Sequence, residues 1–251
     1  MGALHPGHAS LIRAARAACS HVAVSLFVNP AQFGPGEDYA RYPRAFDADC
    51  ALAGKEGADV LFAPPVEEMY PKDAQTLVDV PTLGSKLDGA SRPGHFRGVA
   101  TVVAKLLITS EPDFAFFGQK DAAQVAVLRR LVVDLRFATQ IVVCPIVRDA
   151  DGLALSSRNA YLGAEQRVQA LSLSRAIRQA EKLVAKGERR SQVLLDTARR
   201  IFVCVPALRV DFVALVDWAT LDPIETAVPG SLFAVAAWIG ATRLIDNTII
   251  Q

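Results

Sequence analysis

HPGHASLIRAARAACSHVAVSLFV, residues 5–28, decides the fold class, because a turn, an amphipathic helix and a buried strand follow one another within it. Pro6 and Gly7 predict a tight turn, and the apolar spacing after them predicts a helix over 9–19. The valine-rich run 21–28 predicts a buried strand that ends at Asn29-Pro30. Because the start of a helix leaves backbone N–H groups without partners, the turn is suited to bind an anion such as phosphate.

The same alternation continues to about residue 145. Strands that alternate with helices at this spacing predict βαβ units and an α/β fold with a doubly wound, Rossmann-like parallel sheet. A phosphate-binding turn of this type normally connects a strand to a helix, and no strand precedes HPGH. We therefore expect the first strand of the sheet to be missing, and the complete protein to carry a segment upstream of Met1. The expected helices are 46–56, 99–107 and 121–134, and the expected strands are 59–64, 113–118 and 140–145.

The pattern changes after Pro145. Helical periodicity over about 164–186 and 190–202 precedes three strand-like runs, 209–216, 232–239 and 242–250. Helices followed by consecutive strands predict a smaller α+β domain with an antiparallel sheet. We therefore expect two domains, 1–146 and 147–251.

Charge and composition exclude several classes of protein. The 27 basic and 26 acidic residues give a formal net charge of +1, which argues against a nucleic-acid-binding surface. The cysteines are widely spaced and form no CxxC, so they are interpreted as small buried hydrophobes in a reducing compartment. No apolar run is long enough to span a membrane and no signal peptide is recognisable, so we expect a cytoplasmic protein. The four cysteines are Cys19, Cys50, Cys144 and Cys204.

HPGH by itself leaves three interpretations open. His5 and His8 could donate hydrogen bonds to a phosphate whose charge grows during a reaction. They could equally belong to a helix-capping turn. They could also bind a metal, since His-x-x-His suits two ligands, although no third ligand clusters nearby.

Two segments after strands carry polar side chains suited to substrates. In FVNPAQFGPGEDYARYPR, 27–44, Gln32 offers an uncharged donor and acceptor for a hydroxyl-bearing molecule, and the alternative is a long surface loop. In GQKDAAQ, 118–124, Lys120 could neutralise a phosphate as a point charge, while Asp121 is better explained as a helix cap. Gln124 follows one helical turn later.

Two further segments are polar and lie beside apolar runs. LSSRN, 155–159, places two hydroxyls beside an arginine, which suits a phosphate grip or a closing element, and the alternative is a polar interdomain loop. RPGHFRGVATVVAKLL, 92–107, places His95 and Arg97 just before an apolar helix, where a solvated helix start is the simpler explanation for Arg97.

Together these segments resemble the pantoate–β-alanine ligase family over essentially the whole chain and in order. HPGH and the serine-rich loop alone would indicate only the wider HxGH nucleotidyltransferase superfamily, which includes class I aminoacyl-tRNA synthetases. VNPAQF and the KDxxQ pattern narrow the resemblance to this family. The matching segments are MGALHPGH, VNPAQF, YPR, GHFRGVATVVAKLL, FFGQKDAAQ, VRDADGLALSSRNAYL and the terminal TRLIDN.

The resemblance implies an ATP-dependent condensation of (R)-pantoate with β-alanine. Pantoate would attack the α-phosphorus of ATP to give pantoyl adenylate and pyrophosphate, and β-alanine would then displace AMP. It also implies Mg²⁺ with ATP, a cytoplasmic homodimer, an ATP- and pantoate-binding domain over 1–146 and a lid domain over 147–251. No protein ligand of the metal is implied.

By the same resemblance, individual residues receive roles. His8 is the family's assigned proton donor, Gln32 holds pantoate and borders the β-alanine position, and Gln124 holds pantoate. In-line displacement at phosphorus needs positioning and charge neutralisation, which His5, His8, Lys120, Ser156, Ser157 and Arg158 would supply. The implied ATP contacts are Met1, Gly2, Ala3, Leu4, His5, Pro6, Gly7, His8, Gly118, Gln119, Lys120, Asp121, Val147, Leu155, Ser156, Ser157 and Arg158.

One segment departs from the family pattern, which commonly has GEKD followed by an aromatic residue and glutamine. Gln119, Ala122 and Ala123 stand here instead, while Lys120, Asp121 and Gln124 are retained.

Two alternatives to the ligase function stay open. The chain could be a truncated or degenerate ATP-binding homologue without turnover, or another acyl-adenylate-forming nucleotidyltransferase.

Overall fold

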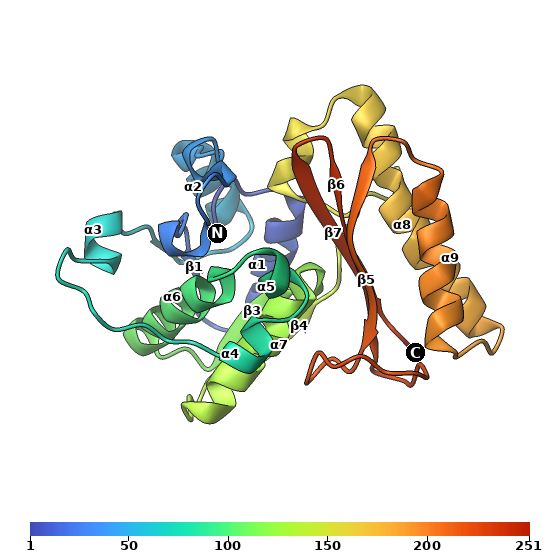
Figure 1. Ribbon diagram of the computed structural model, residues 1–251. Coiled ribbons are helices and arrows are strands. Elements are labelled where there is room, and N and C mark those ends of the chain that lie inside the picture. The colour runs from blue at the N-terminus through green and yellow to red at the C-terminus, as the bar shows by residue number, and fades with distance from the viewer. The chain divides into compact units, whose positions relative to one another are not determined.

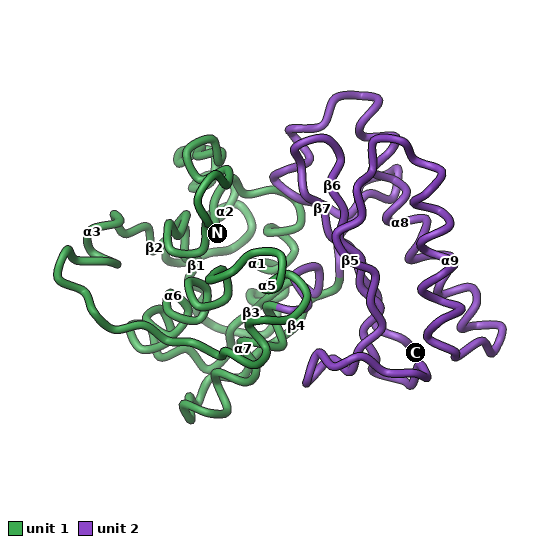
Figure 2. Tube along the Cα trace, in the orientation of Figure 1, with its two compact units in different colours: residues 1–118, 124–145 green, residues 119–123, 146–251 purple.

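The computed structural model describes residues 1–251, which form two compact units (Figure 2). The first unit comprises residues 1–118 and 124–145, and the second comprises 119–123 and 146–251. The chain passes to the second unit after Pro145, beside the expected boundary between 146 and 147. The short segment 119–123 also belongs to the second unit, which the expected domains did not anticipate.

The first unit carries four short strands and the helices that connect them (Figure 1). The strands are β1 (Ala23–Ser25), β2 (Val60–Phe62), β3 (Phe114–Gly118) and β4 (Gln140–Cys144). The longer helices are α1 (Pro6–Ala18), α2 (Phe46–Lys55), α6 (His95–Ser110) and α7 (Ala122–Asp134). The short helices are α3 (Val66–Met69), α4 (Pro81–Gly84) and α5 (Asp88–Ser91), with 3-10 turns η1 (Pro30–Gln32) and η2 (Asp38–Ala40).

The strands of the first unit are parallel, which confirms the predicted α/β class. β1 pairs with β2 and β3 pairs with β4, each in parallel register. The expected doubly wound sheet is present as two separate parallel pairs of strands. They are separate because β1 forms a ladder only with β2, and β3 only with β4. The strand expected over 21–28 was predicted too long, because ladder hydrogen bonds cover only three of its residues. Beyond them, the Phe27 N–H donates to the carbonyl of Met1 at 2.7 Å.

Two helices begin earlier than their apolar spacing predicts. α1 begins at Pro6, because proline suits the first helical position and the preceding His5 caps the helix. α6 begins at His95 directly after Gly94, whose φ of +83° is the left-handed conformation that glycine adopts without strain. Pro6, Gly7 and His8 at the start of α1, and His95, Arg97 and Gly98 at the start of α6, interrupt the apolar spacing, so apolar periodicity does not reveal these turns.

The second unit is a three-stranded sheet with two long helices, as expected. The strand order is β5-β6-β7, antiparallel throughout, with an irregularity in register between Val210 and Phe212. Both helices lie on one face of the sheet (Figure 1), and Phe202 and Phe233 are fully buried in the core that they share. The elements are α8 (Ala164–Ala185), α9 (Ser191–Val203), β5 (Leu208–Val216), β6 (Leu232–Ile239), β7 (Thr242–Ile249), and the 3-10 turns η3 (Gln119–Asp121) and η4 (Ser157–Tyr161).

None of the helices combines the length and the apolar character that crossing a membrane would need.

Gly98 on α6 offers a test of how closely this helix approaches η1. A Cβ atom at Gly98 would lie 2.1 Å from the carbonyl oxygen of Ala31, which is backbone and cannot move aside without distorting η1. We expect Gly98→Ala to lower the free energy of unfolding by about 1–3 kcal/mol in urea titrations. The matched control is Gly54→Ala on α2, where a Cβ meets nothing within 4 Å. The control should be neutral or stabilising by about 0.5–1 kcal/mol. Equal stability of the two variants would contradict the close approach.

Candidate functional site

The two histidines of HPGH cap the start of α1. The Gly7 N–H donates to Nδ1 of His5 at 3.1 Å, and the His5 N–H donates to Nδ1 of His8 at 3.3 Å. The capping interpretation is therefore confirmed. Because a backbone N–H can only donate, Nδ1 of each ring is the acceptor, so a neutral ring carries its proton on Nε2. Capping thus fixes both imidazoles in the tautomer that can donate a hydrogen bond through Nε2.

The residues before the turn are held by a carboxylate from α2. Asp49 is 4% exposed, and its two oxygens accept the N–H groups of Ala3 and Leu4 at 3.0 and 2.6 Å. Ala3 has a φ of +49°, a left-handed conformation that costs free energy in any residue but glycine. Gly2 lies against Val28, since a Cβ there would come within 2.7 Å of Val28 Cγ2. The approach to HPGH is therefore fixed on both sides.

Gln32 lies in η1, which follows β1 after the short segment 26–29, and a buried asparagine organises this turn. Asn29, 2% exposed, donates through Nδ2 to the carbonyl of Gly98 at 3.1 Å and to Oε1 of Gln32 at 3.3 Å. Its Oδ1 accepts the Ala31 N–H and the Tyr70 hydroxyl. Both ends of the amide are thus occupied, and the side chain of Gln32 is oriented by a neighbour that cannot rotate freely.

His95 holds the backbone of the same turn. Arg92 Nη1 lies 3.0 Å from His95 Nε2, and His95 Nδ1 lies 2.8 Å from the carbonyl oxygen of Gln32. Since a guanidinium can only donate, Nε2 is the acceptor and Nδ1–H donates to Gln32. Burial, followed by the nearby charge of Arg92, lowers the pKa of His95 to about 4. His95 is therefore neutral at pH 7 and in the tautomer that this turn needs.

Arg92 also forms a salt bridge with Glu37, at 2.6 Å between Nη2 and Oε2. Arg97, two residues beyond His95, is exposed, as the simpler interpretation of a solvated helix start expected.

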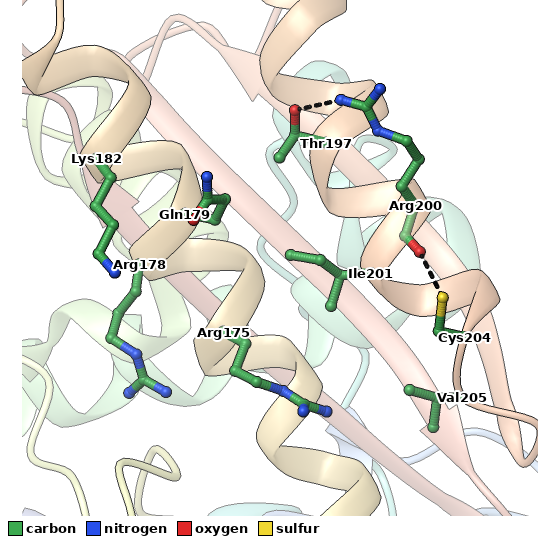
Figure 3. Close-up of a pocket in the computed structure, with 9 residues that line it drawn as sticks. All are labelled: Arg175, Arg178, Gln179, Lys182, Thr197, Arg200, Ile201, Cys204 and Val205. Carbon is green, nitrogen blue, oxygen red and sulfur yellow. Dashed lines mark hydrogen bonds between the residues drawn. The ribbon is translucent and has the colours of Figure 1, made fainter.

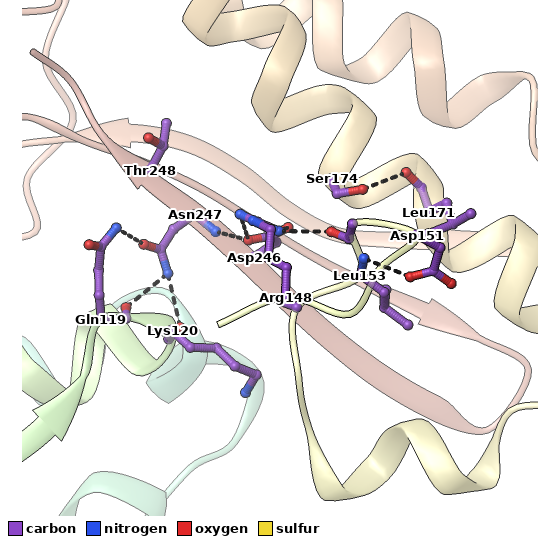
Figure 4. A network of polar contacts seen from close by, with 12 residues as sticks. Gln119, Lys120, Arg148, Asp151, Leu153, Leu171, Ser174, Asp246, Asn247 and Thr248 are labelled. Atoms are coloured by element: carbon purple, nitrogen blue, oxygen red, sulfur yellow. Dashed lines mark hydrogen bonds and ion pairs between the residues drawn. The ribbon is translucent and has the colours of Figure 1, made fainter. Parts of the chain in front are cut away.

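Lys120 lies in η3, in the second unit. Its Nζ is 3.4 Å from Oδ1 of Asp121, and its side chain is 21% exposed. The carbonyl of Lys120 accepts a hydrogen bond from Asn247 of β7 at 2.9 Å, while its side chain extends away from that contact (Figure 4). The backbone of this lysine is therefore fixed while its ammonium stays accessible.

The serine-rich loop lies beside Val147 in the same unit. The Leu155 N–H donates to the Val147 carbonyl at 3.0 Å, which places these two expected ATP contacts next to each other. Ser156 caps η4, because its Oγ accepts the N–H of Arg158 at 3.3 Å. The proposed contacts of 155–158 with ATP stay a prediction.

The expected site residues divide between the two units. Residues 1–8, Gly118, Gln32 and Gln124 belong to the first, and 119–121, Val147 and 155–158 belong to the second. Sequence reasoning missed the residues that hold these segments in place. The signal for Asn29 was its position in VNPAQF, whereas Asp49 looked like an ordinary polar residue of a helix. The missed residues are Asn29, Glu37, Asp49, Tyr70, Arg92, Asp246 and Asn247.

A hollow between α8 and α9 contains none of the expected site residues. It has a volume of about 610 Å³, and its lining combines basic side chains of α8 and α9 with the apolar Ile201 and Val205 (Figure 3). The basic residues are Arg175, Arg178, Lys182 and Arg200.

Over residues 1–251, no three His, Cys, Asp or Glu side chains are grouped closely enough to hold a metal ion.

Comparison with known proteins gives a family for this arrangement. The sequence profile described as Pantoate-beta-alanine ligase matches residues 1–249. The chain belongs to this family. The pantothenate synthetase of Acidobacterium capsulatum is 58% identical over 250 residues, covering 100% of this chain and 84% of that protein. That of Koribacter versatilis is 53% identical, covering 100% and 86%.

Solved structures of pantoate–β-alanine ligases have the same fold. A pantothenate synthetase from Thermus thermophilus superposes with a TM-score of 0.97 at 47% identity, covering 100% of this chain and 91% of that one. The Francisella tularensis pantoate-beta-alanine ligase, described as complexed with beta-gamma ATP and beta-alanine, has a TM-score of 0.80 at 33% identity. It covers 99% of this chain and 87% of that one. The parallel strands and the separate antiparallel sheet are therefore those of this family.

Because His95 is buried in its neutral form, we expect part of the free energy of unfolding to be lost in acid. The unfolded chain binds a proton at this histidine near pH 6.5, but the folded chain does so only near pH 4. The contribution is therefore complete above pH 6.5 and is lost as the pH falls towards 4, by on the order of 2 kcal/mol. Urea unfolding at pH 7 and pH 4.5 should show a smaller acid loss for His95→Gln than for the parent.

The control for this experiment is His21→Gln, which removes an exposed imidazole before β1. It should keep the parental acid loss. The same acid loss in the parent and in His95→Gln would show that His95 is not buried in neutral form.

Proposed function

We propose that this chain joins (R)-pantoate to β-alanine with ATP, through a pantoyl adenylate, releasing pyrophosphate and AMP. The observation that carries the proposal is the capped HPGH turn, which presents two imidazoles in the Nε2–H tautomer at the start of a helix. Such a helix start favours an anion, and the family to which the chain belongs has this reaction in its name.

The first step is an in-line displacement at the α-phosphorus of ATP. A carboxylate oxygen of pantoate forms the new P–O bond, the bond to the bridging oxygen breaks, and pyrophosphate leaves with that electron pair. No protein nucleophile is needed, so the residues act by positioning and by neutralising charge. His8 is proposed to donate its Nε2–H to the phosphates, with Lys120 and Arg158 as cations and His5, Ser156 and Ser157 as neutral donors.

The remaining proposed ATP contacts are the backbone and side chains of Met1–Gly7, Gly118, Gln119, Asp121, Val147 and Leu155.

The second step transfers the acyl group. The amine of β-alanine attacks the acyl carbon, the bond to the AMP oxygen breaks, and the amine loses a proton. The proposed pantoate ligands are Gln32 and Gln124, whose amides pair with hydroxyls without adding charge. Gln32 also borders the proposed β-alanine position, and Asn29 and His95 keep its turn in place. Because water would hydrolyse the adenylate, we propose that the second unit, with its 155–158 loop, closes over it.

Magnesium is proposed to enter with ATP. Asp121 is the only carboxylate among the residues proposed to contact ATP, and its side chain is 49% exposed. One carboxylate together with substrate phosphates fits the way Mg²⁺ usually binds, with water completing the coordination. When bound, the ion would neutralise phosphate charge.

We also propose that the protein is a homodimer and that it is located in the cytoplasm.

Exchange of labelled pyrophosphate into ATP tests the adenylate mechanism. With pantoate and Mg²⁺ present and β-alanine omitted, exchange should occur, because the first step is complete and reversible without the amine. Omission of pantoate should abolish it. Exchange that strictly required β-alanine would overturn the mechanism, and exchange driven better by other carboxylic acids would favour a different acyl-adenylate-forming enzyme. A homologue without turnover would bind ATP and show no exchange.

His8 and Lys120 should each be needed for this exchange. A donor that acts on developing charge is worth about 3–4 kcal/mol, so His8→Ala and Lys120→Ala should lose about 100- to 1000-fold in rate. His8→Gln separates chemistry from capping, because glutamine at the third helical position can restore the capping acceptor but not the imidazole. Lys182→Ala, in the hollow of Figure 3, is the control and should exchange at the parental rate. Near-parental exchange in His8→Gln or Lys120→Ala would refute that residue's role.

A further inference from the structure

Two adjacent polar residues of β7 are buried although nothing in the proposed chemistry uses them. Asp246 and Asn247, in the terminal TRLIDN, are 2% and 3% exposed. Neighbouring residues of a strand point to opposite faces of the sheet, so the two side chains must find separate partners. A buried polar side chain destabilises the fold unless it is hydrogen-bonded, so these partners identify what the pair does.

Asn247 binds the segment that carries Lys120. Its Nδ2 donates to the carbonyl of Gln119 at 3.1 Å and to the carbonyl of Lys120 at 2.9 Å. Its Oδ1 accepts from Nε2 of Gln119 at 3.2 Å. These three contacts converge on the side-chain amide (Figure 4). One side chain therefore fixes the backbone at two successive residues of η3, which no strand ladder supports.

Asp246 holds Asn247 in turn. Its Oδ1 accepts the Asn247 backbone N–H at 2.8 Å, and both of its oxygens accept from the guanidinium of Arg148, at 2.7 and 2.9 Å. Arg148 follows Val147, one of the proposed ATP contacts. The same network therefore reaches both the Lys120 segment and the segment at 147–148, within one unit (Figure 4).

A second side chain fixes the end of the segment. Trp218 Nε1 donates to the carbonyl of Ala122 at 3.0 Å. The carbonyls of residues 119, 120 and 122 are thus all bound by side chains of the second unit, which explains why 119–123 group with it. Gln119, Ala122 and Ala123 are also the positions that depart from the usual family pattern.

We propose that Asn247, held by Asp246 and Arg148, is the positioning residue that sets the place of Lys120 for adenylation. This inference rests on the proposed function, in which the Lys120 ammonium meets phosphate. Asn247 contacts Lys120 only at its carbonyl, since the Lys120 side chain extends in the other direction (Figure 4). Loss of its amide frees two carbonyls, and a displacement of about 1 Å at a phosphate-binding group is enough to slow a reaction about 100-fold.

The test compares three variants with a control in pantoate-dependent pyrophosphate exchange. Asn247→Ala removes all three contacts, and Asn247→Asp keeps the shape but turns both donors into acceptors facing carbonyls. Each should lower the maximal exchange rate about 10- to 100-fold while the KM for pantoate changes little. Trp218→Phe removes only the contact with the Ala122 carbonyl and should give a smaller loss of exchange rate. If the Asn247 variants fail to fold, Trp218→Phe becomes the test of whether side chains of the second unit position η3. The control is Thr248→Val on the same strand, whose hydroxyl donates to Glu181 of α8. It should exchange at the parental rate.

A double-mutant cycle with Lys120→Ala separates positioning from general stability. If Asn247 acts through Lys120, adding Asn247→Ala to Lys120→Ala should reduce exchange by less than about twofold further, because the interaction is already lost. Fully additive losses would overturn the inference. So would parental exchange in the Asn247 variants, or in Trp218→Phe if only that one folds, while Lys120→Ala is impaired. Parental exchange in Lys120→Ala would instead refute the role of Lys120 in the proposed function.

Discussion

The site depends on buried polar side chains that satisfy irregular backbone. Most of the expected site residues lie outside the strand ladders, in a helix start, in 3-10 turns that follow β1 and β3, and in the 155–158 loop, whereas Gly118 is the last paired residue of β3. Their N–H and C=O groups must still be hydrogen-bonded when they leave water. Asp49 does this for residues 3 and 4, Asn29 for η1 and the neighbouring carbonyl of Gly98, and Asn247 for η3.

Two of these side chains come from a distant part of the chain: Asp49 is 46 residues from Ala3, and Asn247 is 127 residues from Lys120. Asn29 directly precedes η1 but binds the carbonyl of Gly98, 69 residues away. The site segments therefore take their shape only when the surrounding helices and strands have packed. Their shape is then rigid, because a short amide or carboxylate with every atom bound has few alternative conformations. Groups that act on phosphate charge need such rigidity, since they work by being in place before the charge develops.

These long-range contacts mark the limit of prediction from the sequence. Periodicity predicted every helix and strand of the second unit to within about one or two residues, because a long apolar face needs a regular pattern. It failed at the first turns of α1 and α6, which begin at a capping histidine and after a left-handed glycine, and at the short strand β1, which has only three residues. Motifs located the segments around HPGH, Gln32 and Lys120. They did not reveal Asp49 or Asn247, although two adjacent polar residues within the apolar pattern of a final strand were a usable signal.

The capping and phosphate interpretations of HPGH use different atoms of the same two imidazoles, Nδ1 for the cap and Nε2–H for the phosphates. Here each Nδ1 accepts one backbone N–H at the start of α1, and the N–H groups of His8 and Ala9 donate to the His5 carbonyl. The backbone donors of the first turn are thus already bonded, so an anion here would be bound by the imidazole Nε2–H groups and the helix dipole. The expected phosphate contacts lie in both units: the helix start and its histidines in the first, Lys120 and the 155–158 loop in the second. In the proposed function, a bound triphosphate would have to satisfy donors of both. Asn247 ties Lys120 to the second unit, so in the proposed function the lysine and the serine-rich loop would reach the phosphates together.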